Sequence, residues 1–229
     1  MKHLDSFSFQ NQRFLIRVDY NVPMDADLNI TDDTRMRATL PTINKIISSG
    51  GSVVLMSHRG RPKDQDDSLS MRHLVAHLSN LLSQDVKFID QCVGDKVTKA
   101  SKSLKSGMVL LVENLRFHIE ETSGDVDFAK QLSELGDVYV NDAFGTAHRE
   151  QASTHSAINS AAKACAGLLL ERETEFLSKT LNNYDHPYIA AIGGAKVSSK
   201  LELIKHINSV ADQIIVGGGI ANTFLKASG

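Results

Sequence analysis

Polar and charged side chains follow directly after the short apolar segments of this sequence. The segment VVLMS leads into HRGRP, so a stretch suited to burial ends in a histidine and two arginines. Three other apolar segments end in the same way. The residues that follow them are Asp19 and Asn21; Glu113, Asn114 and Arg116; and Asn141, Asp142, His148 and Arg149. Arginine binds carboxylates and phosphates through two parallel hydrogen bonds, so these positions predict a site for a small anion.

These side chains can meet only if the apolar segments are strands of one sheet. Strands are predicted at 13–18, 52–57, 86–89, 108–113 and 138–141, each followed by a helical pattern or a short helix. Strands that are apolar throughout and alternate with helices indicate a parallel sheet covered on both faces. Ligands of such sheets bind beyond the carboxyl ends of the strands. We therefore expect the polar residues to line one rim, together with Arg35 at the start of the first helix.

Each of these residues also has an ordinary structural explanation. Asp19 and Asn21 suit a turn, Glu113 suits a structural hydrogen bond or ion pair, and a lone His58 suits a loop. Polar and positively charged residues recur at four strand ends, and this repetition favours the anion site. Arg59 is the weakest member of the set, because adjacent side chains cannot all face one ligand, and its replacement by leucine is expected to cost little.

A second pair of glycine-rich segments lies near the end of the chain. IGGAKVSSK places two glycines and Lys196 between a predicted strand and a helix, with Lys200 about one turn later, and VGGGIANTF contains Gly217, Gly218 and Gly219. Glycines allow close backbone approach, and lysines offer point charges to phosphates. Neither segment has the spacing of a Walker A loop or of the GxGxxG dinucleotide fingerprint, which argues against an NAD-dependent oxidoreductase. The two predicted anion sites together favour phosphoryl transfer between two bound substrates.

Composition narrows the class of protein. The chain has 229 residues and a formal net charge of −2, so no overall basic field indicates nucleic acid. Two distant cysteines indicate neither a disulfide framework nor a zinc site. No signal peptide and no long apolar span is visible, so we expect a cytoplasmic protein that does not enter a membrane.

The pattern along the chain predicts an α/β protein with two parts. A three-layer, Rossmann-like domain with a parallel sheet is expected over 1–167, and a helix over 168–184 is expected to connect it to the next part. Residues 185–229 are expected to begin a second Rossmann-like domain. Pro41 predicts a late start or a kink in the first helix.

The sequence resembles the N-terminal half of phosphoglycerate kinases of the bacterial type. RVDYNVP, SHRGRP, LVENLRF, GDVYVNDAFGTAHR, IGGAKVSSK and IVGGGIANTFL occur in the order found in that family and span nearly all of the chain. The resemblance implies reversible phosphoryl transfer from 1,3-bisphosphoglycerate to ADP, giving 3-phosphoglycerate and ATP. It implies magnesium on the nucleotide, no metal ligand within this chain, and a monomer whose two domains close over a cleft.

The resemblance also implies roles for particular residues. Arg35 and Lys196 are expected to be catalytic, because they would stabilise the phosphoryl group in transfer. The implied substrate-binding residues are Asp19, Tyr20, Asn21, Arg35, His58, Arg59, Gly60, Arg61, Arg116 and Arg149. The implied nucleotide-binding residues are Lys196, Lys200, Gly217, Gly218 and Gly219.

The sequence departs from the family pattern in three places. Arg59 stands where leucine is usual, Ser199 stands where aspartate is common, and the glycine-rich loop whose aspartate handles the metal-nucleotide is missing. Residues 1–229 alone are therefore expected to have little or no kinase activity. The alternative is a non-catalytic fragment that binds 3-phosphoglycerate.

Overall fold

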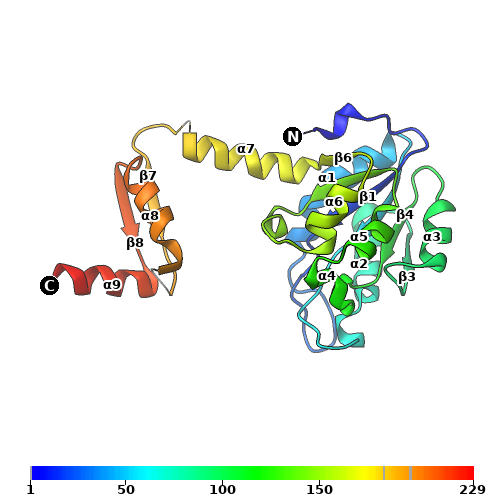
Figure 1. The fold of residues 1–229 in the computed structure, drawn as a ribbon, viewed down its shortest axis with the longest axis horizontal. Coiled ribbons are helices and arrows are strands. Elements are labelled where there is room, and N and C mark those ends of the chain that lie inside the picture. Colours follow the sequence, from blue (N-terminus) through cyan, green and yellow to red (C-terminus); the bar gives the residue numbers. More distant parts are fainter. Residues whose placement is uncertain (1, 183, 196–197) are drawn as a thin grey trace. The chain divides into compact units, whose positions relative to one another are not determined.

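A computed structural model describes residues 2–182, 184–195 and 198–229 (Figure 1). It divides the chain into two compact units, Met1–Thr174 and Glu175–Gly229, which we call unit 1 and unit 2. The helix α7 (Leu168–Asn182) begins in unit 1 and continues into unit 2. No helix among the described residues is long and apolar enough to cross a membrane.

Unit 1 is built on one six-stranded parallel sheet. Its strands are β1 (Arg13–Val18), β2 (Ser52–Met56), β3 (Val86–Ile89), β4 (Val109–Val112), β5 (Val138–Asp142) and β6 (Ala164–Ala166). Their order across the sheet is β3-β4-β2-β1-β5-β6, and every neighbouring pair is parallel. The sequence predicts five of these strands. It misses β6, which has three residues, two of them alanine, a residue with little preference for strands.

Alternate side chains of the central strands feed two separate cores, which is why these strands are apolar throughout. On one face Phe14, Ile16 and Leu55 pack with residues of α1 (Thr34–Ser48) and α2 (Val75–Leu82). On the other face Leu15 and Val54 pack with residues of α3 (Asp95–Lys102), α5 (Val126–Ser133) and α6 (Ala157–Ser160). The short α4 (Ile119–Ser123) precedes α5. The predicted α/β class with a three-layer parallel sheet is confirmed.

The first helix passes through its proline. α1 starts at Thr34, seven residues before Pro41, so the late start predicted from Pro41 is wrong. A proline within a helix removes one backbone donor. The apolar residues Met36, Ile43 and Ile46 bury their side chains in the core on either side of it. This packing holds the helix together across the lost hydrogen bond.

Unit 2 contains a small parallel sheet and two helices. Its elements are β7 (Ile189–Ile192), α8 (Leu201–Asn208), β8 (Gln213–Val216) and α9 (Gly218–Ser228). β7 and β8 are parallel neighbours, as a strand-helix-strand unit requires. Ala190, Ile192, Ile207 and Ile220 form its buried core. The parallel strand-helix-strand unit agrees with the predicted beginning of a second Rossmann-like domain, whereas the boundaries at 167 and 184 remain predictions.

Candidate anion-binding site

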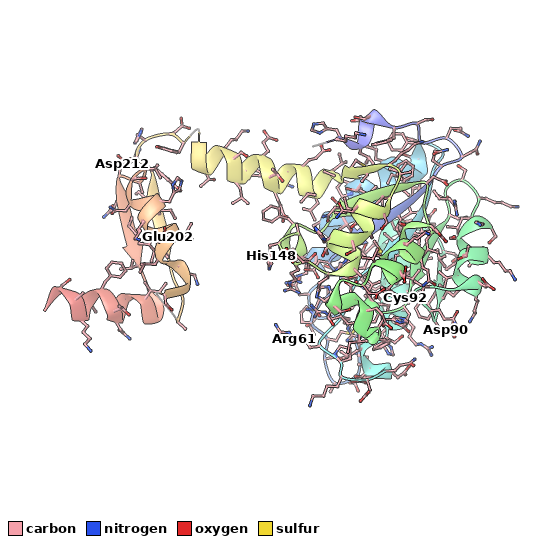
Figure 2. All side chains as sticks on the ribbon, viewed as in Figure 1. Arg61, Asp90, Cys92, His148, Glu202 and Asp212 are labelled. Carbon is pink, nitrogen blue, oxygen red and sulfur yellow. The ribbon has the colours of Figure 1, made fainter. Side chains whose placement is uncertain are left out.

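The predicted rim residues follow strands that are neighbours in the sheet. β1 lies between β2 and β5, and β4 lies on the far side of β2. Because all four strands are parallel, the residues after them emerge at the same edge. Arg35, in the first turn of α1, reaches this edge and places Nη1 2.7 Å from Oδ2 of Asp19. Figure 2 labels Arg61 and His148, which lie toward the same margin of unit 1 in that view.

Two hollows lie at this rim. The larger, of about 810 Å³, is lined in part by Arg61, Lys63, Arg116 and Arg149. The smaller, of about 280 Å³, is lined in part by Asp19, Arg35 and Asp142. Nε of Arg116 is buried and has no hydrogen-bond partner among the described residues. The larger hollow therefore gathers several cations whose charge a bound anion would neutralise.

His58 lies beside these cations but is not one of them. Its side chain is buried, and Nη2 of Arg17 lies 3.1 Å from its Nδ1. Burial and the positive charges of Arg17, Arg116, Arg149 and Arg35 lower the pKa of His58 to about 2. The imidazole is therefore neutral near pH 7 and offers a hydrogen bond rather than a charge.

The turn at Gly60 carries the backbone close to the rim. Its N–H donates to Oδ1 of Asn21 at 2.9 Å, and its carbonyl accepts from Arg116. Gly60 has φ of +62°, a conformation that favours glycine, and an added Cβ would lie 2.9 Å from Leu69. Asn21 and Arg116 thus fix the turn that presents Arg61.

Tyr20, expected from the family resemblance to contact substrate, is turned into the core. Its side chain is fully buried, and its hydroxyl lies 2.9 Å from Oγ1 of Thr39. Burial raises the pKa of this phenol. Side chains alternate between the two faces along an extended chain, so Tyr20 points away from the side taken by its neighbours Asp19 and Asn21. The side chain of Tyr20 thus does not line the rim, and its contact with substrate stays a prediction.

Arg59 also points away from the rim. Only 5% of it is exposed, and Nη1 donates to the carbonyls of Ser68 and Ser70 at 2.7 and 3.4 Å. Its Nη2 lies 2.6 Å from the sulfur of Met24. Arg59 therefore closes the base of the loop between Gly60 and Ser70. The expected substrate contact does not fit this geometry, and the expected indifference to leucine does not either, because leucine cannot bond the carbonyls.

Arg59→Leu is expected to lower the free energy of unfolding by about 1–3 kcal/mol, since it leaves two carbonyls without their charged donor. Urea denaturation of the full chain would measure the change. The exposed neighbour provides the control, because Arg61→Leu removes no buried contact and should change stability by less than about 0.5 kcal/mol. Equal stability of Arg59→Leu and the unmodified chain would contradict the role of Arg59 in closing the base of this loop.

Glu113 and Asn114 form the scaffold beneath this loop. The carboxylate of Glu113 accepts from Oγ of Ser70 and from the backbone N–H groups of Met71 and Asn114, all at 2.7–2.8 Å. Asn114 accepts from the N–H of Arg59 and donates to the carbonyls of Arg59 and Leu69. Both side chains are buried and fully used by the protein. The structural explanation considered for Glu113 fits this geometry.

Asp142 ties the rim to the helix that leaves unit 1. Its Oδ1 accepts from the backbone N–H groups of Leu169 and Leu170 at 3.0 and 3.2 Å, in the first turn of α7. Carboxylates favour this position because the first N–H groups of a helix lack backbone partners. Burial nevertheless raises the pKa of Asp142 to about 6. Asp142 thus holds the first turn of α7 and also lines the smaller hollow.

The predicted phosphate-binding residues of unit 2 are only partly described. Lys196, expected to be catalytic, lies outside the described residues. The N–H of Ile220 donates to the carbonyl of Gly194, which brings the first glycine segment against the start of α9. A Cβ at Gly219 would lie 2.8 Å from the carbonyl oxygen of Ala195, and one at Gly194 would lie 2.9 Å from Nζ of Lys200. The two glycine segments and Lys200 therefore meet at one end of unit 2.

Two residues of the site are missed by the sequence reasoning. Arg17 is fully buried within β1, and Glu121 is fully buried in α4. A signal for Arg17 exists, because an arginine inside the apolar segment RFLIRV must find a partner if it is buried. Glu121 has no such signal, since HIEETS reads as an exposed helix. Among the described residues, no three histidine, cysteine, aspartate or glutamate side chains are grouped so as to hold a metal ion.

The fold and the rim define an α/β protein with a parallel sheet and an arginine-rich hollow at its carboxyl edge. Comparison with known proteins then identifies the family. The model of the phosphoglycerate kinase family matches residues 4–229. The chain belongs to the phosphoglycerate kinase family.

Individual relatives agree with this assignment. Phosphoglycerate kinase of Anaeromyxobacter sp. (strain K) is 47% identical over 232 residues, covering 100% of this chain and 59% of the relative. That of Moorella thermoacetica is 48% identical over 227 residues, covering 99% and 57%. The structure of phosphoglycerate kinase from Coxiella burnetii matches with a TM-score of 0.87 at 41% identity, covering 100% of this chain and 57% of the other. That from Pyrococcus horikoshii OT3 matches with a TM-score of 0.89 at 37% identity, covering 100% and 58%. The chain thus spans somewhat more than half the length of these relatives.

Proposed function

We propose that this protein is a phosphoglycerate kinase, which transfers a phosphoryl group reversibly from 1,3-bisphosphoglycerate to ADP. Unit 1 would bind the phosphoglycerate, and the glycine segments of unit 2 would take part in binding the nucleotide. The observation that carries the proposal is the larger hollow, where Arg61, Arg116 and Arg149 converge. A phosphate with two negative charges suits three guanidinium groups, each of which can bond two oxygens.

The proposed chemistry is positioning and charge stabilisation. Phosphoryl transfer needs little covalent help from the protein, so no nucleophilic side chain is required. Asp19 accepts from one nitrogen of Arg35 and orients the guanidinium, which is 53% exposed and retains other donors. We assign Arg35 to the oxygens of the transferring group and the larger hollow to the phosphate that stays on the substrate.

The nucleotide would meet the backbone at the start of α9. Gly219 approaches Ala195 so closely that only glycine fits, and Lys200 lies beside Gly194. Backbone N–H groups at a helix start suit phosphate oxygens. Magnesium would accompany the nucleotide and neutralise part of its charge.

Arg35→Met is expected to reduce kcat by about 10²- to 10³-fold, the loss seen when a donor to a developing charge is removed. KM for 3-phosphoglycerate should change much less. Arg37→Met is the matched control, because Arg37 lies half a turn further along α1, is 61% exposed and pairs with Asp33. Because residues 1–229 alone are expected to have little activity, a coupled assay measures both variants in a full-length kinase that contains these residues. Small and equal effects of Arg35→Met on kcat and KM would contradict its role in the transition state.

The alternative is a protein that binds 3-phosphoglycerate without catalysis. Titration calorimetry with 3-phosphoglycerate combined with the coupled assay separates the two. Measured on a full-length chain that contains these residues, binding with turnover supports the kinase, whereas binding without turnover supports the alternative. The absence of binding would overturn both.

A further inference from the structure

A line of hydrogen bonds joins a buried carboxylate to the imidazole at the rim. Glu121 accepts from the hydroxyl of Ser153 at 2.6 Å and from the backbone N–H of the same residue at 2.9 Å. Oγ of Ser153 accepts from Nε of Arg17 at 2.9 Å. Nη2 of Arg17 lies 3.1 Å from Nδ1 of His58. All four residues are buried, so water does not compete for these bonds.

The chemistry of arginine gives the line a direction. A guanidinium can only donate hydrogen bonds, so Nδ1 of His58 must accept from Arg17. A neutral imidazole that accepts at Nδ1 carries its proton on Nε2. The contact with Arg17 therefore selects one of the two neutral tautomers.

Arg17 is held in place on several sides. Its Nη1 donates to the carbonyl of Val18, and its Nε is fixed by Ser153. Ser153 is fixed in turn, because the hydroxyl of Tyr139 donates to its carbonyl at 2.6 Å. Glu121 supplies the negative charge that opposes the cost of burying Arg17. Without that charge, we expect the guanidinium to move toward solvent and to release His58.

The surroundings of His58 favour neither the Nδ1–H tautomer nor the doubly protonated imidazolium. Oδ1 of Asp19 lies 4.0 Å from Nδ1, too far for a hydrogen bond, and this carboxylate already accepts from Arg35 and from the N–H of Asn21. The other charged groups that act on His58 are Arg17, Arg35, Arg116 and Arg149, which are all positive and oppose a second proton. The Nε2–H tautomer is the state that this environment allows.

We propose that Glu121, acting through Ser153 and Arg17, is a positioning residue that holds His58 as the neutral Nε2–H tautomer. His58 then meets the anionic substrate as a fixed hydrogen-bond donor. The role toward substrate rests on the proposed function, whereas the tautomer is a property of the protein itself. The protonation state of His58 itself does not vary with pH between about 5 and 8, unlike that of a histidine with an ordinary pKa of about 6.5.

Nitrogen-15 NMR of the histidine rings in the full chain tests the proposal, with His58→Gln used to assign the signal. In the unmodified protein, Nε2 of His58 should carry the proton and no titration should occur between pH 5.5 and 8. Ser153→Ala removes the hydroxyl between Glu121 and Arg17 but keeps the backbone, and Glu121→Gln removes the charge at nearly constant volume. Both should give mixed tautomers or a titrating signal, and a three- to tenfold weaker Kd for 3-phosphoglycerate.

Ser156→Ala is the matched control. Ser156 lies in the same turn and donates to the carbonyl of Gly124, away from Arg17, so its loss should leave the His58 signal unchanged. A proton on Nδ1 in the unmodified protein would overturn the proposal. An unchanged tautomer in folded Ser153→Ala and Glu121→Gln would also overturn it. If the unmodified chain has the Nε2–H tautomer but does not bind 3-phosphoglycerate, the result would count against the proposed function alone.

Discussion

Glu121→Leu is expected to lower the free energy of unfolding by about 3–5 kcal/mol. The substitution leaves Arg17 charged in a fully buried position without Glu121, the carboxylate that compensates it most strongly. The backbone N–H of Ser153 loses its acceptor as well. Urea denaturation of the full chain, followed by circular dichroism, measures the loss.

A double variant separates the charge from the packing. Arg17→Met combined with Glu121→Leu removes both charges, and it should recover most of the stability, since apolar side chains of similar volume can replace buried charges that compensate each other. Glu120→Leu, at the preceding position of α4, should change stability by less than about 1 kcal/mol. If the double variant were as unstable as the sum of the single ones, the charge would not be the cause.

Gly167→Ala is expected to cost about 2–4 kcal/mol. A Cβ at this position would lie 2.2 Å from Oδ1 and 2.4 Å from Cγ of Asp142, a residue that is itself fully buried. Overpacking of this kind costs about 1–3 kcal/mol. Displacing Asp142 also removes the acceptor at the start of α7, which adds about 0.5–2 kcal/mol.

Thermal or urea denaturation of the full chain measures this loss. Gly145→Ala is the matched control, because a Cβ there would meet only Oδ2 of Asp19, at 3.9 Å, and stability should hardly change. Asp142→Gly provides the second test, since it also removes the Cβ of residue 142, which would lie 2.8 Å from the new methyl group, and Gly167→Ala should cost far less in that background. If Gly167→Ala destabilised the protein as much in the absence of the Asp142 side chain, the steric strain would not come from Asp142.

The sequence was sufficient to predict the sheet and the rim, because both depend on short-range patterns. Five apolar segments of four to six residues specify the strands, and parallel pairing then brings their ends together whatever the loops do. Asp19, His58 and Arg116 meet for that reason. The strand at 164–166 was not predicted, because it is stabilised by pairing with β5 rather than indicated by its own composition.

Side-chain direction could not be predicted in the same way. Arg59 and Arg61 are two residues apart in one motif, yet only Arg61 lines the larger hollow, because a chance set of carbonyls lies where Arg59 can reach them. Tyr20 is turned into the core by the packing of α1 on the sheet. The partnership of Arg17 with Glu121 depends on the fold of a helix more than 100 residues away, which no local pattern encodes.

The order of the strands has a consequence for folding. Arg17 and Ser153 are 136 residues apart, and β1 pairs with β5 although β2, β3 and β4 lie between them along the chain. Contacts so distant in sequence form slowly, because a long loop must close first and its closure costs conformational entropy. A partly folded sheet without β5 would leave a bare guanidinium in an apolar strand, so such an intermediate is disfavoured. The charge that orders the finished site therefore also makes the folding of unit 1 more cooperative.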